Sequence, residues 1–145
     1  MRTDQETSRG GGTGIPAAVL ALLGGLFHLV GVAGGAVMLA GDSALGRALL
    51  TFLVHLIVAA LLITGGAGLI LAKQFGRVFT IAGAAVALLL YVLVLVLAAA
   101  GVYFLGISDD TLPVGYAGLL CVPAIATLVL AVARPTARWV TSGWS

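Results

Sequence analysis

Two histidines, one tyrosine and the single cysteine are the side chains that could do chemistry in the apolar part of this sequence. They are His28, His55, Tyr91 and Cys121. Each lies on a stripe of small residues at steps of four and three, which is the spacing of one helix face. Counted from the helix ends near the basic residues, they lie about 18–25 Å along their helices at 1.5 Å per residue. We therefore predict one polar layer inside a helical bundle, formed by these four side chains.

The first interpretation of this layer is structural. An imidazole in an apolar interior needs a hydrogen-bond partner, and a second histidine or a tyrosine hydroxyl supplies one. Hydrogen bonds between helices in a membrane contribute about 0.6–2 kcal/mol each. On this interpretation the cluster fixes the register of the helices and binds no cofactor.

The second interpretation is haem b, with His28 and His55 as its axial ligands. Four-helix membrane cytochromes hold haem between histidines on facing helices, and the protein tunes the iron through those ligands and through burial. The sequence has only two histidines, and it places no arginine inside the apolar stretches to meet the haem propionates. A metal site has less support, because one thiol and no carboxylate lie near the histidines.

The stretches that carry these residues are long enough to cross a bilayer. The chain is 61% hydrophobic and only 8% charged, whereas soluble domains carry about 25% charged residues. Crossing a hydrocarbon core takes roughly 20 residues. Four stretches qualify, at about 15–41, 48–72, 78–107 and 112–133, and none contains Asp, Glu, Lys or Arg. The connections between them are short, so neighbouring helices must be antiparallel.

The predicted fold is therefore an all-α membrane protein, an antiparallel up-down bundle of four transmembrane helices within residues 15–133. Residues 1–14 are predicted to be a disordered polar tail, and residues 134–145 a cytoplasmic or interfacial tail. Asp110 and Thr111 are candidate N-caps of the fourth helix. Pro123 is expected to kink that helix, and Pro135 to end it.

The charges predict the orientation. Six of the seven basic residues fall on one side of the predicted membrane: Arg2, Arg9, Lys73, Arg77, Arg134 and Arg138. The other side carries Arg47 with Asp42, Asp109 and Asp110. Loops rich in Lys and Arg stay in the cytoplasm, so both termini are predicted to be cytoplasmic.

Small residues predict where the helices pack, because they let helix backbones approach closely in lipid. The packing positions predicted from the stripes are Gly24, Gly31, Gly35, Gly66, Ala84 and Gly101. Other glycines fall off the stripes and are predicted to remain for a partner protein or a second copy of the chain: Gly25, Gly34, Gly65 and Gly68.

Several function classes are disfavoured by what the sequence lacks. It has no phosphate-binding loop after a strand and neither an HExxH nor a GxSxG motif, so we expect no enzyme activity. The basic residues form no stripe for nucleic acid. In size the chain resembles the small multidrug-resistance exporters. Those proteins depend on a glutamate in the first span, which is absent here.

A broader resemblance rests on the small-residue stretch 65–72, on the basic turn from Lys73 to Arg77, and on the Ala/Gly-rich stretch that follows from Val78. In these parts the chain resembles the small four-span membrane proteins of actinobacteria rich in Ala, Gly, Leu and Val. The resemblance is one of composition and layout, and it implies a bacterial cytoplasmic membrane.

The expected function is a non-catalytic accessory, assembly or stabilising subunit of a larger membrane complex. A haem-binding electron-transfer subunit is the first alternative, and a small transporter or channel is the second. The expected partners are the lipid bilayer and other membrane proteins or a second copy, with no nucleic acid.

Overall fold

The computed structural model describes residues 12–41, 45–102 and 114–142, and all the secondary structure in these residues is helical. The helices are α1 (Gly14–Ala40), α2 (Leu45–Ile70), α3 (Gln74–Ala99), α4 (Val114–Val132) and α5 (Arg134–Ser142). The first four are long and apolar enough to cross a membrane. The prediction of four apolar helices long enough to span a membrane is confirmed.

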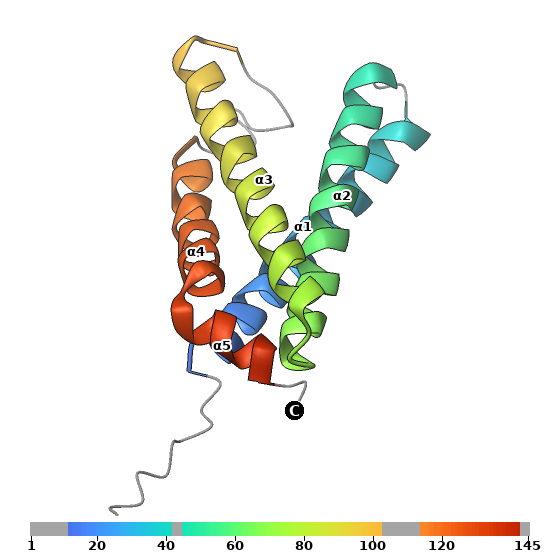
Figure 1. Cartoon of the computed structure of the whole chain (residues 1–145). Coiled ribbons are helices and arrows are strands. Elements are labelled where there is room, and N and C mark those ends of the chain that lie inside the picture. Colours follow the sequence, from blue (N-terminus) through green and yellow to red (C-terminus); the bar gives the residue numbers. More distant parts are fainter. Residues whose placement is uncertain (1–11, 42–44, 103–113, 143–145) are drawn as a thin grey trace, which may run out of the picture.

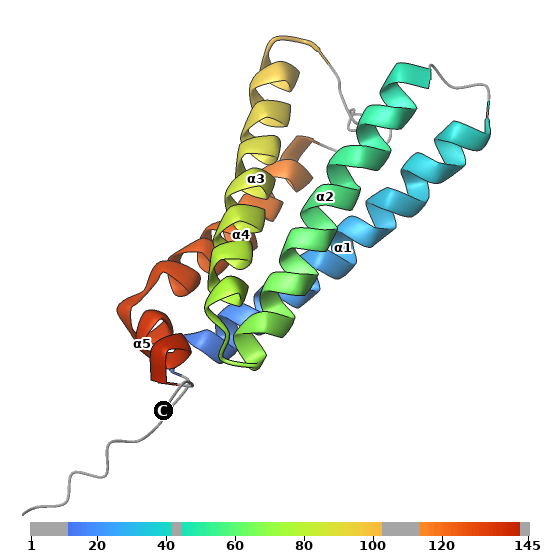
Figure 2. The ribbon, with the colours of Figure 1, turned by 45° about the vertical axis from the view of Figure 1, so that its right-hand side comes forward.

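Consecutive long helices run antiparallel, and they form two pairs (Figure 1). The α1–α2 pair and the α3–α4 pair meet near the turn between α2 and α3, where α5 also lies. They diverge toward the opposite end, as Figures 1 and 2 both show. We call these the closed end and the open end of the bundle.

The core is built mainly from small side chains. A central cluster contains Ala21, Val58, Leu62, Ala84, Ala87, Tyr91 and Ala124, and a second cluster at the closed end contains Ala17, Ala18, Leu69, Ala131 and Val140. The large apolar side chains mostly point outward, as expected for helices solvated by hydrocarbon. Alanines in the core let the backbones come close enough for van der Waals contact to hold the helices together.

The tightest approach joins α2 to α3 at the closed end. A Cβ on Gly76 would collide with the backbone of Gly68, and a Cβ on Gly65 would lie 2.5 Å from the backbone nitrogen of Thr80. Glycine is required at these positions because there is no space for a side chain between the two helices.

The C-terminal end of α3 departs from the sequence prediction. α3 ends at Ala99 rather than near residue 107. Gly101 has a φ of 74°, and Val102 donates a backbone hydrogen bond of 2.8 Å to the carbonyl of Leu97. This is the Schellman arrangement, in which a glycine in the left-handed region ends the helix. Gly101 was predicted to pack between helices, but a Cβ added there would have no atom within 4 Å. Gly101 ends the helix instead.

The C-terminal segment folds back as α5 and covers the closed end. Thr136 and Val140 are fully buried on its inner face. Trp139 donates from Nε1 to the carbonyl of Leu69 at 3.1 Å. Thr136 donates to the carbonyl of Leu130 at 2.6 Å, so the 2.6 Å contact between Thr13 and Thr136 has the Thr13 hydroxyl as donor. The segment predicted as an interfacial tail is thus an integral part of the packing.

The predicted break near Pro135 is present, but a new helix follows it. α4 ends at Val132 and α5 begins at Arg134, with Pro135 in its first turn, where a missing N–H costs nothing. Arg77 of α3 satisfies two terminal carbonyls of α4, since its Nε lies 2.9 Å from the oxygen of Ala131 and its Nη2 3.1 Å from that of Val132. Arg77 therefore ties α3 to α4.

Some of the predictions about helix ends and tails concern residues outside the described ranges. The candidate N-caps Asp110 and Thr111 lie outside them, as do residues 1–11 of the predicted disordered tail. Gly14 is already the first residue of α1, and Thr13 is its N-cap. α4 continues as a helix through Pro123.

Replacing Gly76 by alanine is expected to lower the free energy of unfolding by about 1–3 kcal/mol, because the new methyl group forces α2 and α3 apart. Gly34 is the matched control, since a Cβ added there would have no atom within 4 Å. Gly34→Ala should leave stability unchanged or raise it by up to about 1 kcal/mol through helix propensity. Unfolding of the purified protein in mixed detergent micelles, followed by circular dichroism, measures both values. Equal effects at the two positions would contradict the close α2–α3 contact.

Candidate intramembrane site

His28 is the centre of a hydrogen-bonded chain in the middle of the bundle. It lies on α1 and is 1% exposed. Its Nδ1 is 2.9 Å from Nδ1 of His55 on α2, and its Nε2 is 3.0 Å from the hydroxyl oxygen of Tyr91 on α3. We call these three residues the His–His–Tyr chain. The structure thus brings together three of the four residues of the predicted polar layer, one from each of the first three helices.

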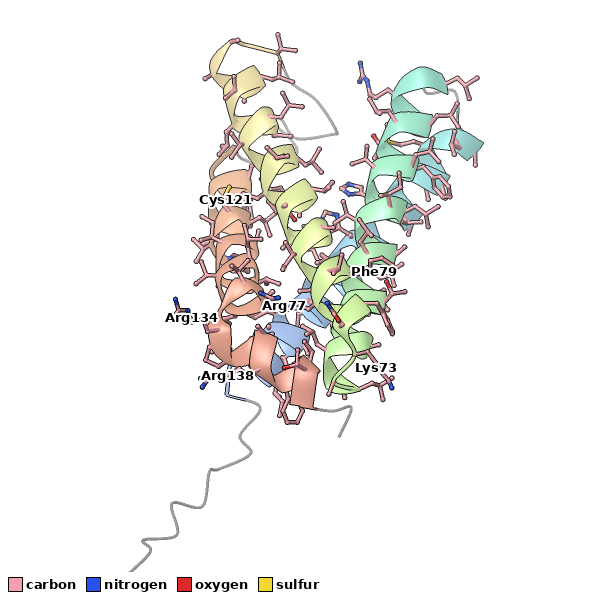
Figure 3. The ribbon with its side chains drawn as sticks, in the orientation of Figure 1. Lys73, Arg77, Phe79, Cys121, Arg134 and Arg138 are labelled. Atoms are coloured by element: carbon pink, nitrogen blue, oxygen red, sulfur yellow. The ribbon has the colours of Figure 1, made fainter. Side chains whose placement is uncertain are left out.

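Cys121, the fourth residue of the predicted layer, makes its hydrogen bond elsewhere. Its thiol donates to the carbonyl of Ala117, one turn earlier in α4, with a sulfur–oxygen distance of 3.4 Å. Cys121 packs against the central core cluster, which contains Tyr91, and Figure 3 shows its place on α4. It is a neighbour of the His–His–Tyr chain and not a member of it.

Glycines on α1 create the space in which the chain forms. The ring of His55 lies directly against α1 at Gly31, where any Cβ would collide with the imidazole. One turn further, a Cβ on Gly35 would lie 2.7 Å from Cα of Phe52. The GxxxG pair therefore faces α2, and it allows the His55 ring to reach His28.

The other predicted packing positions that face a neighbour also lie in helix contacts. A Cβ on Gly24 would be 3.2 Å from the side chain of Leu62, and one on Gly66 would be 2.9 Å from that of Leu22. Ala84 is buried in the central core cluster. These contacts join α1 to α2, and Ala84 contributes from α3.

Three of the four glycines expected to remain for a partner are used inside the bundle. A Cβ on Gly25 would lie 2.6 Å from the Ile63 side chain, while Gly65 and Gly68 face α3. These glycines lie off the predicted stripes, because one stripe gives each helix a single packing face. α2 packs against both α1 and α3 and so needs two. Of the four, Gly34 alone has no neighbour within 4 Å.

Counting protons shows that the chain has two forms. Two neutral histidines and one tyrosine carry three exchangeable protons, but the chain contains two hydrogen bonds. If His28 donates to His55, then Tyr91 donates to His28 and the spare N–H is on His55. If His55 donates to His28, then His28 donates to Tyr91 and the spare O–H is on Tyr91. Interconversion needs one proton to leave Nε2 of His55 and another to reach the oxygen of Tyr91, because a shift along the two hydrogen bonds alone would leave a cationic His55 and an anionic Tyr91.

A cavity of about 200 Å³ adjoins this chain. Its polar lining includes His28 and Tyr91, together with Thr127 of α4, whose hydroxyl donates to the carbonyl of Pro123 at 2.7 Å. The apolar lining comes from all four long helices: Leu20, Leu23, Gly24, Phe27, Leu62, Ala84, Ala87, Leu120, Pro123 and Ala124.

Two residues beside the His–His–Tyr chain were not predicted from the sequence. Phe27 packs edge-on against His28, with ring centroids 5.6 Å apart, and lines the cavity. Thr51, one helical turn before His55, is buried, and its hydroxyl has no hydrogen-bond partner among the described residues. The available signal was their spacing of one and four residues from the two histidines, which many other residues in apolar helices share.

The arrangement of the histidines does not leave room for a haem iron between them. A bond from an imidazole nitrogen to a metal is about 2 Å long, so two axial nitrogens lie about 4 Å apart. Here the facing nitrogens are 2.9 Å apart and hydrogen-bonded. Haem binding stays a prediction that requires the two rings to separate. Within the described residues there is also no group of three or more His, Cys, Asp or Glu side chains that could hold a metal ion.

Comparison with known proteins found no matching family model, no matching curated protein and no matching solved structure.

Replacing Tyr91 by phenylalanine is expected to lower the free energy of unfolding by about 0.6–2 kcal/mol, because it removes one interhelical hydrogen bond. In a His28→Leu background the same change should cost close to nothing, because the partner is already gone. Tyr116→Phe is the matched control, at a tyrosine that is 54% exposed. Equal losses from Tyr91→Phe in both backgrounds would show that the two side chains do not interact.

We expect the protein purified from its native membrane to show no Soret absorption band, because both nitrogens of His28 are engaged in hydrogen bonds. An absorption spectrum in mild detergent tests this. A Soret band that disappears in both His28→Ala and His55→Ala would establish haem ligation and overturn the hydrogen-bonded arrangement.

Proposed function

We propose that the protein is a non-catalytic accessory subunit that docks sideways on a larger membrane protein. The observation that supports this most is the exposed face of α1 toward the open end of the bundle. We call it the Gly34 face, and it consists of Val30, Ala33, Gly34 and Val37. Val30 and Val37 are each 72% exposed, which puts them among the most exposed large apolar side chains described.

Gly34 differs from the other glycines in the interior of α1. Gly24, Gly25, Gly31 and Gly35 all face residues of α2, whereas Gly34 faces nothing in the described chain. A glycine inside a helix costs about 1 kcal/mol relative to alanine, and packing within this bundle does not offset that cost at Gly34. A flat glycine surface flanked by two valines is the kind of surface on which a second transmembrane helix packs.

The proposal includes an orientation and a location. Four basic side chains gather at the closed end: Lys73, Arg77, Arg134 and Arg138 (Figure 3). Arg47 is the one basic residue of the described chain near the open end, in the first turn of α2. Positive charge is retained on the cytoplasmic side, so we place the closed end and both termini in the cytoplasm. The layout and composition support a bacterial cytoplasmic membrane.

Site-specific crosslinking in native membranes tests the docking face. In a Cys121→Ala background, Gly34→Cys is expected to give a crosslinked product larger than a dimer of this chain when a maleimide–benzophenone reagent is coupled to the new thiol and photoactivated, because the benzophenone inserts into C–H bonds of any neighbouring protein. Leu89→Cys is the matched control on α3, because Leu89 is 69% exposed and is not part of the Gly34 face. It should give no such product.

Two outcomes would contradict the docking proposal. A product with the mass of two copies would show that the Gly34 face joins two copies of this chain rather than a larger protein. Crosslinking at Gly34 no stronger than at Leu89 would show that lipid covers both faces equally.

A further inference from the structure

The cavity beside the His–His–Tyr chain has the volume of a site for one small ring. Its lining includes Gly24 of α1, Ala84 and Ala87 of α3 and Ala124 of α4, where small residues leave space between the helices. Its volume is about 200 Å³. An apolar cavity of about 150 Å³ in a protein is known to take up benzene, so this one has room for a single substituted ring.

The cavity opens sideways toward the hydrocarbon, between α1 and α4. Leu23 and Phe27 on α1 line it and are also 58% and 46% exposed. Pro123 on α4 lines it and is exposed as well. Residues that border both the cavity and the outer surface mark its mouth. A ligand would therefore enter from the lipid, and any long apolar tail would stay there.

Tyr91 lines the cavity, and its hydroxyl can form a hydrogen bond with either kind of partner. When the spare proton is on Tyr91, its O–H is free to donate to a carbonyl oxygen. When the spare proton is on His55, Tyr91 donates to His28, and its oxygen accepts a bond from a ligand hydroxyl. Tyr91 is 7% exposed, so a hydrogen bond there is shielded from competing water.

We propose that this cavity binds the ring of a lipid-soluble quinone or its quinol, with one ring oxygen hydrogen-bonded to the hydroxyl of Tyr91. A ring with oxygen at its edge and an apolar tail matches the volume, the lateral mouth and a largely apolar lining with a few polar groups. The two proton arrangements of the His–His–Tyr chain accommodate the carbonyl and the hydroxyl form in turn. This proposal does not rest on the docking at the Gly34 face, since the cavity is lined by this chain alone.

The test uses the purified full chain in lipid nanodiscs and a benzoquinone that carries a decyl chain. Quinone retained by the protein is measured by equilibrium filtration against empty nanodiscs of the same lipid. Saturable binding of about one quinone per protein is expected. Uptake no greater than in empty nanodiscs would overturn the proposal.

Variants identify the site. Tyr91→Phe should weaken binding about three- to tenfold, through loss of one hydrogen bond, and Tyr116→Phe should not. Ala124→Leu should abolish binding because the larger side chain fills the cavity, whereas Ala67→Leu, at an exposed position of α2, should leave it intact. Circular dichroism and thermal unfolding confirm that each variant is folded.

A second probe separates a ring site from a site for lipid tails. Decylbenzene has the same tail and a ring without oxygen, so it should bind more weakly than the quinone and be insensitive to Tyr91→Phe. If both probes bind equally and Tyr91→Phe changes neither, the cavity holds acyl chains and the quinone assignment is wrong.

Discussion

A polar group surrounded by hydrocarbon must find its partner within the protein, and in this bundle that requirement is concentrated on His28. The imidazole is almost completely buried, and each of its nitrogens contacts a side chain from another helix. One residue on α1 thereby sets the depth at which α2 and α3 must lie. Moving either helix along its axis by one turn, about 5.4 Å, would break one of the two bonds.

Close packing of small residues makes those hydrogen bonds geometrically possible. The His55 ring reaches Nδ1 of His28 because Gly31 leaves the surface of α1 flat beneath it. At the closed end, Gly68 and Gly76 bring α2 and α3 into backbone contact. There α5 is joined to α2 by the hydrogen bond from Trp139 to the carbonyl of Leu69. Gly31 therefore both brings α1 and α2 together and leaves room for the polar chain, and a methyl group there would disrupt both.

Much of this arrangement could be predicted from the sequence, because two patterns in it are strong. Runs of 20 or more uncharged residues predicted the four long helices. Stripes of small residues at steps of four and three, one on each helix, together with the count of residues from the helix ends, placed His28, His55 and Tyr91 at similar depth. Cys121 lies on the stripe of the fourth helix at the same depth. A thiol, however, can donate to a carbonyl of its own helix, as an imidazole cannot readily do, so depth did not determine its partner. Gly101 shows the same limit, since a glycine can serve a packing face or a helix end, and the backbone angle that distinguishes them is not encoded in spacing.

The proposed docking face and the mouth of the cavity form one surface. Leu23, Phe27, Val30, Gly34 and Val37 follow one another on α1 at steps of four, three, four and three, which places all five on one side of the helix. The first two border the cavity, and the last three belong to the Gly34 face.

A partner helix packed along this side, if it continued toward the closed end, would pass over the mouth through which a ligand enters. Docking and ligand exchange would then be linked, because a ring already in the cavity would be enclosed against the partner and a ring still in the lipid would be excluded. Such a geometry suits a subunit that holds a lipid-soluble molecule beside a larger protein, and it requires no catalytic group on this chain.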